Sequence, residues 1–266
     1  MLFSIDIGPV TVPVYSLLAL VGAAAMVLVV LRWPYVKAAP RQDVGYSLCY
    51  AFIGALVGAK LLYIISAFPE FVAYLRTEGL TLEFFSLLFG GGIVFYGGLL
   101  GGLLGVYIYA RRYQVPLYSL LDAIAPGVPL FHCFGRLGCF AAGCCWGEET
   151  DLPIGVVLAS SPFAPHVPLL PVQLFEAGGN LLLFIGLLLY TRRPRPDGLP
   201  TFLYLSLYAM LRFILEFFRG DELRGIFGPF STSQWISLAL LAVSLTWFIR
   251  HRLEIKKARE NPGTCS

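Results

Sequence analysis

The sequence predicts an all-α integral membrane protein with seven transmembrane helices, its N-terminus outside and its C-terminus in the cytoplasm. Hydrophobic residues make up 58% of the chain and charged residues only 13%, about half the charged share of an ordinary soluble domain. Apolar runs of about 18 residues or more, long enough to cross a bilayer core of about 30 Å, recur along the chain. Basic residues gather in alternate connections between these runs, as expected of cytoplasmic loops.

The apolar runs define the elements in order. The first run contains no Lys or Arg and shows no evident small-residue cleavage site, so we expect a retained helix and not a signal peptide. The second and third are spaced by glycines, and Pro, Gly and Asp dilute the fourth. The fifth and sixth carry charged residues, and the seventh leads into a basic tail. The predicted spans are residues 12–31, 44–67, 91–110, 117–135, 172–191, 200–218 and 232–249.

These spans leave no room for a soluble domain. We therefore expect one membrane domain over residues 1–252 and a short basic cytoplasmic tail over residues 253–266. Most of the 19 Lys and Arg residues fall in four segments assigned to the cytoplasmic side, and these are residues 32–43, 111–112, 192–195 and 250–259. The sequence has no basic stripe, so nucleic acid is not an expected partner.

Charged residues within or at the ends of the apolar runs are candidates for function. A charge at the centre of a membrane helix costs at least about 2.5 kcal/mol, so it is normally paired, faces a cavity or serves a function. Buried ion pairs that fix helix packing, or arginines that snorkel to the interface, are the structural alternatives. The residues concerned are Lys60, Asp122, Arg136, Glu176, Arg212 and Glu216.

Arg136 and Arg212 both fall near the outer ends of their predicted spans. Arg136 is flanked by Gly135 and Gly138, and glycine allows a ligand to approach the backbone closely. Two guanidinium groups at one interface suit a phosphate, which each can bind through two N–H groups. We expect the outer end of the fourth span to break into a loop in which Arg136 contacts a lipid phosphate.

Several ordered blocks resemble the prolipoprotein diacylglyceryl transferase family. "IGPVTVPVYSLLALVG" is similar to the opening segment of that family, with Tyr15 at its tyrosine, and "GGGIVFYGGLLG" to the entrance of its third helix. "GRLGCFAAGCCWG" is similar to its signature loop, and "YAMLRFILEFFR" keeps its Tyr-x-x-x-Arg pair as Tyr208 and Arg212. "GALVGAKLLY" and "PVQLFE" resemble two further elements.

The resemblance implies a bacterial inner-membrane enzyme that moves diacylglycerol from phosphatidylglycerol to the lipobox cysteine of a preprolipoprotein. The expected partners are phosphatidylglycerol, other membrane lipid and the preprolipoprotein signal peptide, and no cofactor or metal is expected. The implied catalytic residues are Arg136, Arg212, Tyr96 and Tyr208. The implied substrate-binding residues are Tyr15, Gly97, Gly98, Gly135, Gly138, Cys139, Gly147, Gln173 and Glu176.

Some positions depart from the usual pattern of the family. Tyr96 stands where a histidine is usual, and Cys139 and Cys144 stand where asparagine and glutamate are usual. Neutral tyrosine is a poor base because its pKa is about 10, so we expect Tyr96 to donate a hydrogen bond. A divergent relative that transfers another lipid group, or that binds lipid or peptide without this chemistry, is the alternative, and a transporter is a weaker one.

Cys139, Cys144 and Cys145 form a cluster with three interpretations. On the outer side a disulfide between Cys139 and either Cys144 or Cys145 can form. The thiols can also simply fill tight packing, and a metal site that includes His132 or a redox function is the least favoured interpretation. Gln173 and Glu176 either orient an arginine or the loop, or have a purely structural role. Residues 69–88 are expected to form an interfacial arm.

Overall fold

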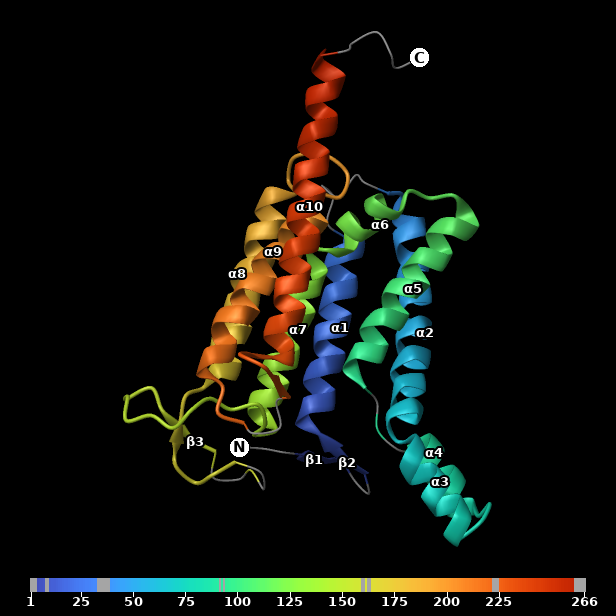
Figure 1. Cartoon of the computed structure of the whole chain (residues 1–266), viewed down its shortest axis with the longest axis vertical. Helices are drawn as coiled ribbons and strands as arrows, with labels where there is room; N and C mark the ends of the chain where they lie inside the picture. The colour runs from blue at the N-terminus through green and yellow to red at the C-terminus, as the bar shows by residue number, and fades with distance from the viewer. Residues whose placement is uncertain are drawn as a thin grey trace. The chain divides into compact units, whose positions relative to one another are not determined.

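The computed structural model describes residues 4–7, 10–32, 39–90, 92, 94–158, 161, 164–221 and 225–260. The described chain is predominantly helical (Figure 1). It forms two compact units, one made of Met1–Val36 with Ile124–Ser266 and one made of Lys37–Ala123. Each unit is described by itself.

The first unit is a row of five long helices with short strand pairs at their ends. β1 (Ser4–Ile7) pairs antiparallel with β2 (Val10–Pro13), and the chain then enters the first helix directly. The helices are α1 (Val14–Arg32), α7 (Gly127–Ala141), α8 (Val172–Tyr190), α9 (Leu199–Leu215, continued by the 3-10 turn η1 at Glu216–Phe218) and α10 (Thr232–Glu260). The remaining strand pairs are β3 (Val156–Val157) with β4 (Pro168–Leu169) and β5 (Ile226–Phe227) with β6 (Phe230–Ser231).

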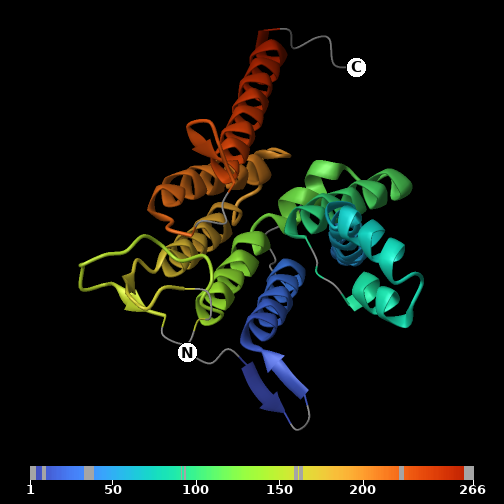
Figure 2. The same ribbon diagram turned by 60° about the horizontal axis from the view of Figure 1, so that its bottom comes forward.

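Neighbouring helices in this row contact one another in the order α1, α7, α8, α9 and α10 (Figures 1 and 2). Small residues permit the close approach of α1 to α7, because a Cβ atom added to Gly22 would lie 2.6 Å from Cβ of Phe134. This packing places α7, α8 and α9, which carry the candidate charged residues, side by side.

The second unit is built on a pair of glycine-rich helices, α2 (Arg41–Ser66) and α5 (Phe95–Tyr113). A Cβ atom added to Gly54 would lie 2.2 Å from the carbonyl oxygen of Gly101, so the two backbones are in direct contact. Such small-residue contacts are typical of membrane helices. The short helix α6 (Leu117–Ile124) follows α5 and crosses the boundary between the two units.

Two short helices, α3 (Phe68–Thr77) and α4 (Leu82–Gly90), follow α2 (Figure 1). Buried Ala67, Phe71 and Phe84 form a small core between them. Leu82 is 90% exposed at the start of α4. The segment 69–88, which was expected to form an arm, is therefore largely helical. The position of this segment at the membrane interface stays a prediction.

The described residues contain five helices long and apolar enough to cross a membrane, or six if a bent pair counts as one span. The five are α1, α2, α8, the continuous segment of α9 and η1, and α10, and the bent pair is α6 with α7. The chain is therefore a multi-pass membrane protein by the length and composition of its helices. α5, the counterpart of the predicted third span, is not among these candidates. Its glycines, tyrosines and two terminal arginines dilute its apolar character.

The prediction of one continuous helix over residues 117–135 is wrong. The structure has two helices there, α6 and α7, which meet at an angle of 44°. Pro126 and Gly127 stand at the break, and proline interrupts the helical hydrogen-bond ladder. α7 then continues to Ala141, so Arg136 lies inside a helix and not in the predicted loop.

The last helix also differs from the prediction, because α10 runs to Glu260 and not to residue 249. Its C-terminal half extends beyond the other helices of the first unit (Figure 1). Most of the predicted tail over residues 253–266 is therefore helical, and residues 261–266 lie outside the described residues. The short strand pairs were not predicted.

Candidate functional site

Glu176 joins two arginines at the centre of the site. Its Oε1 lies 3.0 Å from Nε of Arg136, and its Oε2 lies 3.3 Å from Nη1 of Arg212. The three residues come from α8, α7 and α9, so the contact requires these three helices to pack side by side. The structure therefore brings together both arginines and the glutamate predicted to orient them.

The ionic network continues from Arg212 toward the end of α9. Nη2 of Arg212 lies 2.7 Å from Oε2 of Glu216 and donates to Oγ of Ser233 at 3.1 Å. Nη1 of Arg219 lies 3.8 Å from the same Oε2, and Arg219 also pairs with Asp221. Three arginines thus face three carboxylates, and the cluster has little net charge by itself.

The ionic network is largely buried, so loss of one partner would be costly. Glu176 is 1% exposed and Arg212 7%, and charges taken out of water are tolerated only when they are paired and hydrogen-bonded. Arg136 differs, because 21% of its side chain is exposed. Arg136 is therefore the member of the central trio that a ligand can reach.

The terminal nitrogens of Arg136 pair with no carboxylate among the described residues. Within the described ranges, Arg136 makes an ion pair through Nε alone, to Glu176. A Cβ atom added to the preceding Gly135 would meet nothing within 4 Å. A guanidinium that is paired through Nε can still donate to a phosphate or carboxylate through its two Nη groups.

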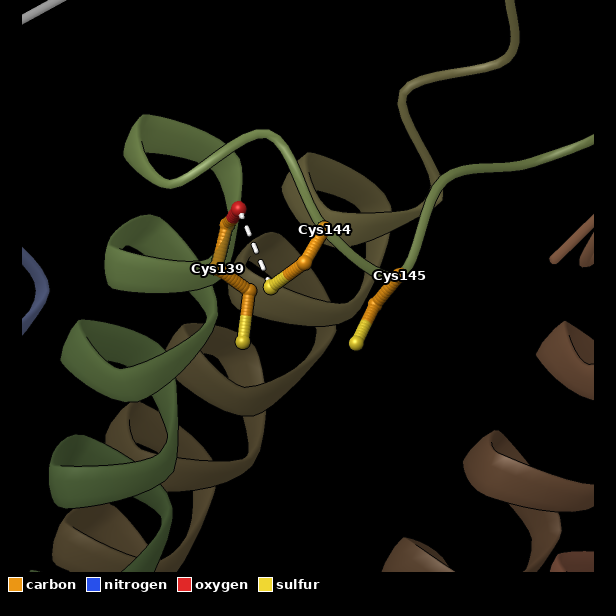
Figure 3. Close-up of side chains that lie close together, drawn as sticks. All are labelled: Cys139, Cys144 and Cys145. Carbon is orange, nitrogen blue, oxygen red and sulfur yellow. Dashed lines mark hydrogen bonds between the residues drawn. The ribbon is translucent and has the colours of Figure 1, made fainter. Parts of the chain in front are cut away.

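The last turn of α7 carries Cys139, and the segment that follows it carries Cys144 and Cys145 (Figure 3). The N–H and Sγ of Cys144 both donate to the carbonyl of Cys139, at 3.1 and 3.6 Å. Nε2 of Gln173 donates to the carbonyl of Cys144 at 2.8 Å, so Gln173 contacts the loop as predicted. All three thiols are free cysteines in the structure, and the predicted disulfide between Cys139 and Cys144 or Cys145 is not formed.

Electrostatic interactions link this turn to the ionic network. Side-chain hydrogen bonding with Cys139 and Cys144 lowers the pKa of Cys145, and burial opposes this effect. The Arg219 and Arg136 guanidiniums also lower that pKa. Burial acts to lower the pKa of Arg219, but Asp221, Cys145 and Glu216 together raise it. The Arg219 and Arg136 guanidiniums therefore favour the thiolate form of Cys145.

Other predicted site residues of the first unit surround this centre. A Cβ atom added to Gly138 would lie 2.9 Å from Cδ2 of Tyr15, so the start of α1 packs on α7 at the residue just before Cys139. Gly147 makes a strand-like bridge with Arg219, and a Cβ atom there would lie 2.6 Å from the carbonyl oxygen of Leu170. Both glycines are thus required by close packing.

Tyr208 lies one turn before Arg212 on α9, among aromatic rings. Its ring centroid is 5.0 Å from that of His132 and 5.9 Å from that of Tyr204. The hydroxyl of Tyr204 and Nδ1 of His132 share a hydrogen bond of 3.1 Å. His132 is therefore part of this aromatic cluster, and the described residues that group as possible metal ligands do not include it.

The remaining predicted residues belong to the second unit. Tyr96 lies in the first turn of α5 and is 42% exposed. Gly97 is buried, and a Cβ atom on it would lie 2.3 Å from the carbonyl oxygen of Gly58, whereas Gly98 has ordinary contacts with Ala55 and Ala59. In this unit Gly97 serves the contact between α2 and α5, and the ligand-binding roles of Tyr96, Gly97 and Gly98 stay predictions.

Sequence reasoning missed part of the network. Glu216 was noted as a charge in the sixth span but was not assigned to the site, although its spacing of four residues from Arg212 places both on one helix face. Arg219, Asp221 and Ser233 were also missed. Their positions depend on how the end of α9 and the start of α10 fold back, which no local pattern indicates.

The described chain combines helices long enough to span a bilayer with a buried ionic network among them. It is therefore a multi-pass membrane protein with a polar cluster between its helices. A profile described as prolipoprotein diacylglyceryl transferase matches residues 1–250. The chain belongs to the prolipoprotein diacylglyceryl transferase family.

Individual relatives agree with this assignment. The phosphatidylglycerol–prolipoprotein diacylglyceryl transferase of Clostridium tetani is 40% identical over 197 residues, which cover 74% of this chain and 76% of that protein. The enzyme of the same name from Cupriavidus pinatubonensis is 32% identical over 99% of this chain and 96% of its own. That of Nitrosomonas europaea is 33% identical over 96% of this chain and 92% of its own.

Proposed function

We propose that this chain transfers the diacylglyceryl group of phosphatidylglycerol to the lipobox cysteine of a preprolipoprotein. The relatives that cover almost all of the chain carry the name of this activity. The single structural observation that supports it best is the guanidinium of Arg136, which is held by Glu176 through Nε while 21% of the side chain stays exposed. Such a group is suited to a phosphodiester.

The reaction places definite demands on the site. The acceptor thiolate attacks the glycerol carbon that carries the phosphate, so that a C–S bond forms, the C–O bond breaks and glycerol 1-phosphate leaves. The phosphate gains negative charge as the C–O bond breaks. A fixed guanidinium in a site shielded from water stabilises that charge more in the transition state than in the ground state.

The two arginines have different roles in this proposal. Arg136 contacts the phosphate directly. Arg212 shares Glu176 with it and is held by Glu216 and Ser233. Arg212 therefore adds positive potential and fixes the carboxylate that orients Arg136. Tyr208 and Tyr15 line the same region, and Tyr96 donates a hydrogen bond to the substrate.

The proposed topology has seven spans, with the N-terminus outside and the C-terminus in the cytoplasm, in the bacterial inner membrane. α5 is added to the six candidate spans and is the third in chain order. The basic residues at the C-terminal ends of α1, α5 and α10, and those just after α8, mark the cytoplasmic ends. Arg136 then lies near the outer face, where the acceptor cysteine of a translocated substrate is presented.

Reconstitution tests the proposal directly. The purified chain is placed in vesicles with phosphatidylglycerol labelled in its headgroup glycerol, together with a peptide that carries a lipobox cysteine. We expect thioether-linked diacylglyceryl peptide and one labelled glycerol phosphate for each modified peptide. A peptide whose cysteine is replaced by serine is the control. Absence of the thioether, from a chain that is folded and inserted, would favour the divergent relative.

A further inference from the structure

Three thiols converge at the end of α7 (Figure 3). Cys139 lies in the last turn of the helix, and Cys144 and Cys145 follow on the next turn of the chain. Their Sγ atoms all lie within 4.8 Å of one another, and each residue is partly buried. No other group of three possible ligand residues of this kind occurs within the described ranges.

The backbone that presents these thiols is held from outside the turn. Gly143 and Cys145 adopt left-handed conformations, with φ of 63° and 61°, and cysteine rarely adopts such a conformation. Oγ of Ser161 donates to the carbonyl of Gly143 at 2.8 Å, and Gln173 donates to that of Cys144. The site is therefore organised before any ligand binds, which reduces the entropic cost of binding.

The spacing suits a thiophilic metal ion. A zinc–sulfur bond is about 2.3 Å long, so two sulfurs of a tetrahedral zinc site lie roughly 3.8 Å apart. The three sulfurs, now within 4.8 Å of one another, are therefore close to the spacing that the ion requires. Soft thiolate ligands select Zn²⁺ and similar d¹⁰ ions over Mg²⁺ or Ca²⁺.

The surroundings also suit the charge of such a site. Three thiolates and Zn²⁺ together carry one negative charge, and the Arg136 and Arg219 guanidiniums interact electrostatically with the sulfur of Cys145. Positive groups next to a thiolate site offset this negative charge, as interactions around a metal centre often do.

We propose that Cys139, Cys144 and Cys145 form a three-thiolate site for Zn²⁺, with the fourth position left to water or another ligand. The proposal is independent of the proposed transfer reaction, since it concerns metal binding to the resting protein. It assigns a common purpose to three cysteines that packing alone leaves unexplained.

Metal titration tests the proposal. The full chain is purified in detergent with reductant, stripped with a chelator and titrated with Zn²⁺ against a chromophoric competitor. We expect one tightly bound Zn²⁺ for each chain. Cys139→Ser, Cys144→Ser and Cys145→Ser should each lower the affinity by at least the 10–100-fold that loss of an outer partner costs at metal sites. Cys133→Ser, earlier in α7, and Cys49→Ser, in α2, are the matched controls and should bind as the parent does.

A second measurement uses the parent protein and does not depend on the folding of any variant. Alkylation of the parent protein is followed peptide by peptide by mass spectrometry, with and without Zn²⁺. The ion should slow modification of Cys139, Cys144 and Cys145, and exposed Cys49 serves as the internal reference. Equal alkylation rates, equal affinity in the triple serine variant, or a disulfide between two of the three in protein isolated without reductant would overturn the proposal.

Discussion

Glu176 holds the site together, because one buried carboxylate contacts two arginines from two different helices. If it is neutralised, Arg136 loses its orienting partner, and the buried Arg212 keeps only Glu216 and Ser233 among its described partners. Removal of one partner from a buried ion pair is costly since the other charge remains in a poorly solvated position.

We therefore predict that Glu176→Gln lowers the free energy of unfolding by about 3 kcal/mol or more. At roughly 2–4 °C for each kcal/mol, the unfolding midpoint in detergent should fall by about 6–12 °C. Glu148→Gln, at an exposed position on the loop after α7, is the control and should leave the midpoint unchanged. If the Glu176→Gln protein is as stable as its parent, the ion pairs of Glu176 do not contribute to stability as their burial implies.

Tyr96 is predicted to act as a hydrogen-bond donor and not as a base. Tyr96→Phe removes only the hydroxyl, and a hydrogen bond to a charged group is worth about 1.5–3 kcal/mol. The transfer rate should fall by roughly 10–100-fold, while Tyr96→His should retain or increase it. Tyr113→Phe, at the opposite end of α5, is the matched control. Full activity of the phenylalanine variant would refute the donor role.

The sequence indicated which residues belong to the site better than it indicated which residues contact one another. The cost of a charge in an apolar run singled out Arg136, Glu176 and Arg212 from the sequence alone, and the structure places these three in contact. Asp221 and Ser233 gave no such signal, because their roles depend on loops that return to the site. The three cysteines could be grouped by sequence distance, but the direction of their side chains depends on the left-handed turn at Gly143 and Cys145.

At the scale of elements, α7 carries the greatest share of the site and differs most from its prediction. Length and hydropathy indicated a span there, but they do not show where Pro126 separates it into α6 and α7. They also placed the end of the helix before Arg136, because glycines suggest a loop. Packing against α1 and α8 stabilises the glycines in helical form and extends the helix to Ala141.

Substitutions at two glycines of α7 separate the effect of helix packing from the effect of ligand access. Alanine at Gly138 would place Cβ 2.9 Å from Tyr15, whereas alanine at Gly135 meets nothing. We predict that Gly138→Ala lowers thermal stability, while Gly135→Ala is stable, or more so by up to about 1 kcal/mol, but raises KM for phosphatidylglycerol several-fold.

The control for this pair is Gly178→Ala on α8, where an added Cβ atom also meets nothing within 4 Å. Gly178→Ala should leave KM unchanged. Its stability should change only by the small gain that alanine gives over glycine in a helix. If Gly135→Ala behaves as Gly178→Ala does in both measurements, the open surface beside Arg136 is not where the lipid binds.

For the whole molecule, composition and the repetition of apolar runs predicted an all-helical multi-pass membrane protein, and the structure and the family assignment confirm it. Length and hydropathy are enough to predict helical structure in each of the apolar runs. The strand pairs, the break before α7 and the extent of α10 do not, because they depend on turn geometry and on contacts between helices. The number of spans and the orientation stay proposals.

The central claim is that the Arg136 guanidinium, supported by Arg212 through Glu176, binds the phosphate of phosphatidylglycerol during transfer. Lysine keeps the positive charge but loses the planar pair of N–H donors, and loss of one preorganised donor in an active site typically costs about 100-fold or more in rate.

The most direct test is the transfer rate from phosphatidylglycerol to a lipobox peptide in vesicles that contain Arg136→Lys or Arg212→Lys. Arg76→Lys, at the end of α3, serves as the control. We predict that both site variants insert normally and lose about 100-fold in rate, while the control keeps the activity of the parent. Rates within a few-fold of the parent for both Arg136→Lys and Arg212→Lys would contradict the account.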